Sequence, residues 1–169
     1  MLSLDLKCEP VPNPYPERER DHGEIWARID LAVVDEQGAT VRSVLSCEWN
    51  ADELLTWLVA NKQALLGDPL PPPLGGRGGA SIAERVQRFY NDDEVPSDED
   101  LDQVFAYRVS HGVRFGMRGT DVPDVYVGLG GEGYEISAWD DSGGWRHPVD
   151  VADFVQRAER IAGGLRACR

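Results

Sequence analysis

The chain has 169 residues and a mass of 18.7 kDa, the size of one domain or slightly more. Its composition, 41% hydrophobic and 28% charged, is that of a folded soluble protein and excludes disordered, collagen-like and membrane-spanning classes. Thirty acidic residues against 17 basic ones give a net charge of -13. This balance argues against a nucleic-acid-binding protein, because such proteins neutralise phosphates with lysine and arginine.

Three segments near the start of the chain show the alternation typical of β-strands. Apolar side chains occupy every second position in residues 2–6 and 25–33, and nearly every second position in residues 41–49. Turn-forming residues 35–38 separate the last two segments, which predicts a β-hairpin. Residues 10–21 contain four prolines and many charges, so we expect a surface loop there.

Four amphipathic helices are predicted, each beginning at a residue whose side chain can cap the first turn. These caps and helices are Asn50 (residues 50–66), Ser81 (81–90), Ser97 (97–111) and Asp150 (150–165). The helix that begins at Ser97 is expected to bury Leu101, Val104, Phe105 and Val109.

A Pro/Gly-rich segment, residues 69–79, is expected to form a flexible linker. It separates two α+β halves, residues 1–68 and 80–169. Because both halves are short, we expect one continuous core and a single domain over residues 1–169.

Period-two patterning returns after Gly112. Val113, Phe115 and Met117 alternate with polar or small residues, which predicts a strand, and further strands are expected over residues 125–129, 134–138 and 145–147. Together these elements predict an α+β fold with antiparallel sheets from two β-meander segments and about four helices packed on one side.

Several short motifs resemble known binding sites without meeting their requirements. Gly128 to Gly133 match a dinucleotide-binding pattern, but a strand follows where a helix must begin, so a hairpin turn is the better interpretation. Asp98, Asp100 and Asp102 have the spacing of an EF-hand, but the glycine and the closing glutamate of that loop are missing. We therefore predict no bound metal ion.

The cysteines Cys8, Cys47 and Cys168 are far apart and form no CxxC motif. We find no pattern typical of a signal peptide and no N-glycosylation acceptor. A reduced, cytoplasmic protein without a cofactor is the simplest interpretation, and the excess of arginine over lysine favours a bacterial origin.

One basic cluster stands out in this acidic chain, and we treat it as a candidate recognition surface. Its residues are Arg108, His111, Arg114, Arg118, Tyr126 and Trp139. On the predicted strand Arg114 and Arg118 would share an outer face, and Glu135 and Ser137 of a neighbouring strand would join it. A solvated sheet face and an anion-binding pocket are the alternatives.

The densest acidic run is a candidate contact for a basic partner. Its residues are Asp92, Asp93, Glu94, Asp98, Glu99, Asp100 and Asp102. Such a run accelerates capture of a basic protein by electrostatic steering, although acids at a helix start also interact favourably with the helix dipole. We therefore expect a non-enzymatic interaction protein, such as an immunity or antitoxin-like protein or a DNA-mimicking inhibitor. The alternative is an enzyme or anion-binding protein that uses the arginine cluster.

Overall fold

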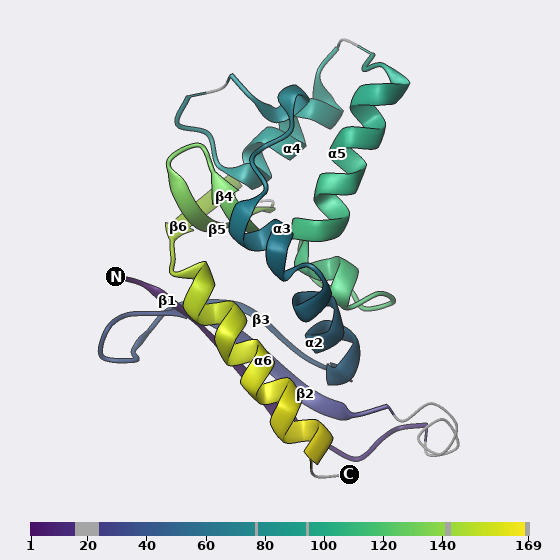
Figure 1. Ribbon diagram of the computed structural model, residues 1–169, viewed down its shortest axis with the longest axis vertical. Helices are drawn as coiled ribbons and strands as arrows, with labels where there is room; N and C mark the ends of the chain where they lie inside the picture. The colour runs from purple at the N-terminus through teal and green to yellow at the C-terminus, as the bar shows by residue number, and fades with distance from the viewer. Residues whose placement is uncertain (16–23, 77, 94, 141–142, 168–169) are drawn as a thin grey trace.

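The computed structural model describes residues 1–15, 24–76, 78–93, 95–140 and 143–167 (Figure 1). This part of the chain forms two three-stranded antiparallel sheets and five α-helices, four of them with ten residues or more. The predicted α+β fold class is confirmed. The first sheet and helix α6 (Val151–Ala167) lie in the lower half of Figure 1, and helices α4 (Ile82–Asn91) and α5 (Asp98–His111) lie in the upper half.

The first sheet is the predicted N-terminal meander. Strands β1 (Ser3–Pro10), β2 (Trp26–Val34) and β3 (Thr40–Asn50) follow one another in antiparallel order. The Asp35 carboxylate accepts hydrogen bonds from the backbone N–H groups of Gln37 and Ala39, each at 2.9 Å, which closes the β2–β3 turn. The β2–β3 hairpin is therefore closed by residues that are close together in the sequence.

Helices α2 (Ala51–Ala60) and α6 bury their apolar faces in the larger of two hydrophobic clusters, together with the first sheet. The predicted caps are present, since Asn50 accepts from the N–H of Asp52 at 3.2 Å and Asp150 from that of Asp153 at 2.9 Å. The helix predicted as continuous to residue 66 is interrupted at Asn61, whose side chain donates to the Trp57 carbonyl. Residues Lys62–Gly67 continue as the short helix α3.

The second sheet contains β4 (Val125–Gly130), β5 (Gly133–Asp140) and β6 (Gly143–Pro148). One face contributes to the larger cluster through Val125, Val127, Ile136 and Ala138. The other face is covered by α4 and α5, which form a smaller hydrophobic cluster with it. The second sheet is therefore closed on both faces.

The Pro/Gly-rich segment is not a flexible linker throughout, contrary to the prediction. Residues Pro72–Leu74 form a 3₁₀ turn, η1, and the Leu74 side chain is buried in the smaller cluster. Arg85 of α4 is itself buried and donates to the carbonyls of Leu74 and Ala80 at 2.8 and 2.9 Å. This guanidinium holds the middle of the segment, and the residue that directly follows it, against α4.

The strand predicted over residues 113–117 is absent, and a 3₁₀ turn, η2 (Val113–Gly116), takes its place. Phe115 and Met117 donate to the carbonyls of Gly112 and Arg114, each at 3.0 Å. Gly116 packs against α2 so closely that a Cβ would lie 3.0 Å from that of Trp57. Close packing at the glycine fixes a tight turn where the sequence alternation indicated an extended strand.

Helix α5 lies in the predicted place but buries a set of side chains that only partly matches the prediction. Val104, Tyr107 and His111 are buried, whereas the Phe105 side chain, predicted to be buried, is 55% exposed. The positions that pack are three and four residues apart and face β4 and α3. The prediction was correct for the helix and for the burial of Val104, and wrong for Phe105.

The first and last elements of the described chain lie side by side. Leu2 forms an isolated parallel bridge with Val149, and the N–H of Asp150 donates to the Leu2 carbonyl at 3.3 Å. The larger hydrophobic cluster includes residues from both sides of the Pro/Gly-rich segment, such as Leu58 and Val127. Among the described residues, no helix combines the length and the apolar character needed to cross a bilayer.

Candidate interaction surface

The acidic run lies in the connection between α4 and α5, at the end of the molecule furthest from the first sheet (Figure 1). We call its described members the acidic edge: Asp92, Asp93, Asp98, Glu99, Asp100 and Asp102. All are exposed except Asp100, which is partly buried, while Glu94 lies outside the described residues. Residues from both ends of the predicted run are therefore accessible to solvent.

Two serine caps place the acidic edge. The Ser81 hydroxyl accepts from the N–H of Glu84 at 3.1 Å and begins α4, and the Ser97 hydroxyl accepts from the N–H of Asp100 at 3.2 Å and begins α5. Both caps were predicted from the sequence. Acids occupy the first turn of α5, at the positive end of the helix dipole, where negative side chains are favourable.

Three carboxylates of the acidic edge are not neutralised by the residues that the structure describes around them. Asp93, Asp98 and Asp102 form no ion pair within the described part of the chain. No lysine, arginine or histidine occurs in residues 89–107. The field of these carboxylates therefore extends into solvent, where it attracts cations over about 8 Å at physiological ionic strength.

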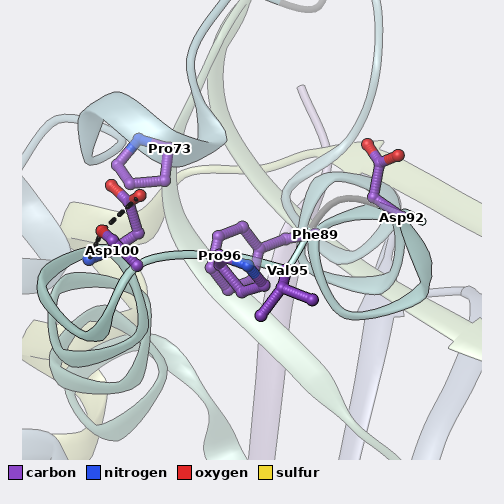
Figure 2. Close-up of a pocket in the computed structure, with 7 residues that line it drawn as sticks. Pro73, Phe89, Asp92, Val95, Pro96 and Asp100 are labelled. Carbon is purple, nitrogen blue, oxygen red and sulfur yellow. Dashed lines mark hydrogen bonds between the residues drawn. The ribbon is translucent and has the colours of Figure 1, made fainter.

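Apolar side chains accompany these acids. Val95 is 94% exposed, and with Pro73, Phe89 and Pro96 it lines a groove of about 260 Å³. Figure 2 shows the Phe89 ring, Pro96 and Val95 at the centre of this groove, with Asp100 on one side and Asp92 on the other. An exposed apolar patch with a charged rim is typical of protein interaction surfaces.

The arginine cluster has a different character, because two of its three arginines are paired within the chain. Arg114 donates to the Asp124 carboxylate at 2.8 Å, and Arg108 lies 3.8 Å from the other oxygen of the same group. Arg108 also donates to the Tyr126 hydroxyl at 3.0 Å, and its guanidinium lies 5.0 Å from the centre of the Tyr90 ring. One aspartate thus holds two of the three arginines, and Arg118 is exposed.

The outer face predicted for the candidate recognition surface is covered by α4. Tyr126, Glu135 and Ser137 are buried, and only Trp139, 39% exposed, is near solvent as predicted. Burial raises the pKa of the Tyr126 phenol to about 12, so this hydroxyl stays protonated and accepts from Arg108. The structure does not bring Tyr126 and Trp139 together with the arginines on one open face.

His111 is buried in the interior. Its ring stacks on Tyr107, with 3.8 Å between the centroids, and packs against Gly128, where a Cβ would lie 2.5 Å from the imidazole. Burial lowers the pKa of His111, so the ring is neutral at pH 7 and adds no positive charge to the cluster. This placement does not favour the anion-binding alternative, which needs His111 to face a ligand beside Arg108 and Arg114.

A buried polar layer beneath α4 was missed by sequence reasoning. Glu135 accepts from the N–H of Ile82 at 2.7 Å, and Ser137 accepts from that of Ala83 at 3.2 Å, so two side chains of β5 cap the first turn of α4. The glycine-rich turn between β4 and β5 is the sequence feature that could have indicated this layer, because its glycines leave room for the buried side chains. A Cβ at Gly130 would lie 2.5 Å from the Glu135 carboxylate, and one at Gly131 would lie 2.9 Å from Arg85.

Metal and thiol chemistry have little support in the described residues. Within them, no three histidine, cysteine or acidic side chains are arranged to hold a metal ion. Cys8 and Cys47 are free and lie opposite the same residue, Ile29, from two different strands, which separates their Cα atoms by about 10 Å, too far for a disulfide. Burial, with a smaller contribution from Asp30, raises the pKa of the Cys8 thiol to about 11. Cys168 lies outside the described residues.

Searches against protein-family models, curated proteins and solved structures each gave no match.

Proposed function

We propose that this chain is a non-enzymatic interaction protein that captures a basic partner protein through the acidic edge. A bacterial, cytoplasmic protein with an immunity, antitoxin-like or inhibitory role is the form of this proposal that we favour. The observation that carries it is the combination of three exposed carboxylates without ion partners among the described residues, those of Asp93, Asp98 and Asp102, and a nearly fully exposed Val95 in the same segment.

Electrostatics and burial each contribute a different part of such an interaction. Carboxylates on one surface raise the association rate of a positively charged partner and fix its orientation. The free energy of the complex comes mainly from apolar side chains that lose water, and Val95, Phe89 and Pro96 offer that surface at the same place. A basic protein that binds nucleic acid, such as a nuclease toxin, fits this surface as partner because the acids replace the phosphates.

Three substitutions test the proposal with a matched control. The edge variant is Asp93→Asn, Asp98→Asn and Asp102→Asn, and the control is Glu9→Gln, Glu48→Gln and Asp121→Asn. All six residues are exposed, and within the described part of the chain none forms an ion pair. Both variants change the net charge by the same three units.

Each form is used as bait in a lysate of the source organism, and association rates are then measured with the purified partner. We expect the wild type and the control to recover the same basic protein. The edge variant should associate about tenfold more slowly at low salt, and its dissociation rate should change less. Equal recovery and equal rates for the edge variant and the control would overturn the proposal.

A further inference from the structure

The groove beside the acidic edge combines two chemistries in a small space. Its walls are the proline rings of Pro73 and Pro96, the Phe89 ring and the Val95 side chain. Its polar groups are Asp92, Ser97 and Asp100. At about 260 Å³ it is smaller than the 300–1,000 Å³ typical of small-molecule sites, so its size suits one side chain better than a whole metabolite.

Carboxylates lie on two sides of the apolar centre. In Figure 2, Asp100 lies on the side of Pro73 and Asp92 lies on the opposite side, at the end of α4. A side chain that enters between them would meet negative charge at its tip and apolar surface along its stem. Neutral and acidic side chains match only part of this arrangement.

Several contacts hold the groove in shape before anything binds. The Ser97 hydroxyl donates to the Asp100 carboxylate at 2.7 Å, which orients that group. Phe89 lies edge-on to Tyr90 with 5.1 Å between the ring centroids. The 3₁₀ turn that carries Pro73 is held by the bond from Arg85 to the Leu74 carbonyl. A site that is ordered in advance loses less entropy on binding.

We infer that this groove receives an arginine side chain from the basic partner, an inference that rests on the proposed function. The guanidinium is flat, weakly hydrated and able to stack on an aromatic ring while it donates to a carboxylate. A lysine ammonium is more strongly hydrated and cannot stack in this way. The groove therefore selects arginine over lysine at equal charge.

Two synthetic peptides provide the test. Both are acetylated nine-residue Gly/Ser peptides, one with three arginines and one with three lysines at the same positions. Binding to the ¹⁵N-labelled full chain is followed by NMR titration at 20 mM and 150 mM salt. We expect the arginine peptide to bind about threefold more tightly, with the largest shifts at the amides of Phe89, Val95 and Ser97.

Asp100→Asn and Asp98→Asn form a matched pair of variants. Both residues lie in the first turn of α5 and both substitutions remove one negative charge, but only Asp100 lines the groove. Asp100→Asn keeps an oxygen that can accept from Ser97, and it should weaken binding of the arginine peptide about three- to fivefold. Asp98→Asn should weaken it less than twofold.

Phe89→Leu separates the role of the ring from that of the charge, because it keeps an apolar wall and leaves every carboxylate in place. It should remove the preference for arginine over lysine while both peptides still bind. Thermal unfolding of each variant, followed by circular dichroism, identifies any that fail to fold, and those are replaced by Phe89→Met or Asp100→Ser.

The outcomes for the groove and for the proposed function differ. If both peptides bind equally and Asp100→Asn behaves like Asp98→Asn, the arginine groove is overturned and capture by the acidic edge stands. If neither peptide binds at 20 mM salt, both are overturned. Arginine preference that persists in Asp100→Asn and in Phe89→Leu also contradicts the groove.

Discussion

Helix α4 joins two polar regions, one buried beneath its first turn and one exposed beside its last turn. Its first turn lies on the second sheet, where Glu135 and Ser137 are buried and bonded to its backbone N–H groups. Its last turn lies beside the acidic edge, where the carboxylates face solvent. Both regions are rich in polar residues, yet only the second remains available to a partner.

The difference lies in how each charge is compensated. In the buried region each described carboxylate or guanidinium has protein partners, because a buried charge without them is strongly destabilising. At the acidic edge Asp93, Asp98 and Asp102 are exposed and have no ion partner among the described residues, so solvent compensates their charge and a basic protein can take its place. The comparison shows that packing, and not composition, decides which charges can serve in recognition.

The largest expected effect concerns Arg85, which belongs to the buried region. Arg85→Ala removes the donors to the Leu74 and Ala80 carbonyls and a positive charge near Glu135. We expect the free energy of unfolding to fall by about 3–5 kcal/mol, as for other broken buried charge networks. Urea denaturation measures this loss.

Arg88→Ala is the control for that prediction. Arg88 lies on the same helix, is exposed and pairs with Glu84 one turn earlier. Loss of such a surface pair should cost no more than about 0.5 kcal/mol. Similar losses of unfolding free energy for the two alanine variants would mean that Arg85 is not buried in a closed network beneath α4.

A smaller effect is expected at the boundary between the two regions. Tyr126→Phe removes the hydroxyl that accepts from Arg108 and leaves the ring in place. The free energy of unfolding should fall by about 0.5–1.5 kcal/mol, the usual contribution of one hydrogen bond. Arg108 would then depend on Asp124 and on the Tyr90 ring. An unchanged urea midpoint would contradict this role of the phenol.

Glu135→Gln tests the buried carboxylate through its pH dependence. Burial raises the pKa of Glu135 above its ordinary value, despite the N–H of Ile82 and the nearby arginines, which lower it. The folded state therefore binds this proton more tightly than the unfolded state, and the free energy of unfolding should fall as the pH rises through the raised pKa. The glutamine variant does not titrate.

Urea denaturation of both proteins between pH 4 and pH 8 provides the measurement for Glu135. The glutamine variant should gain stability relative to the wild type as the pH increases, with the change confined to the interval between the ordinary and the raised pKa. Two parallel stability curves would show that Glu135 titrates as an exposed carboxylate does.

The smallest effect on stability is expected at the acidic edge itself. Asp93→Asn, Asp98→Asn and Asp102→Asn together should change the free energy of unfolding by no more than about 0.5 kcal/mol, because exposed substitutions away from structural contacts have little effect. A loss above about 2 kcal/mol, measured by the same denaturation, would mean that these acids mainly stabilise α5. The acidic edge would then resemble the buried region, in which charged side chains stabilise the fold.

The sequence was sufficient for elements that depend on neighbouring residues. Alternation identified the strands of both sheets, and Asn50, Ser81, Ser97 and Asp150 marked helix starts correctly because a cap acts within one turn. The acidic run could be read from the sequence because its members lie close together in the chain. Of those that the structure describes, all but Asp100 are exposed.

What sequence reasoning missed depends on contacts between distant residues. The caps that β5 gives to α4 join positions 53 and 54 residues apart. The glycine-rich turn indicates close packing at this place, but no local pattern identifies α4 as the partner. The burial of Tyr126 beneath α4 and the burial of His111 also depend on contacts between residues distant in the sequence. The strand predicted over residues 113–117 was wrong because Gly116 packs closely against α2. Sequence alternation does not reveal such a contact.

The bridge between Leu2 and Val149 has a consequence for the order in which the protein forms during synthesis. These residues are 147 positions apart, and α6 lies directly after the second of them. The N-terminal strands therefore leave the ribosome long before the helix that covers them exists, and their apolar face stays exposed for that time. Closing so long a loop makes folding slow and gives chaperones a period in which to bind.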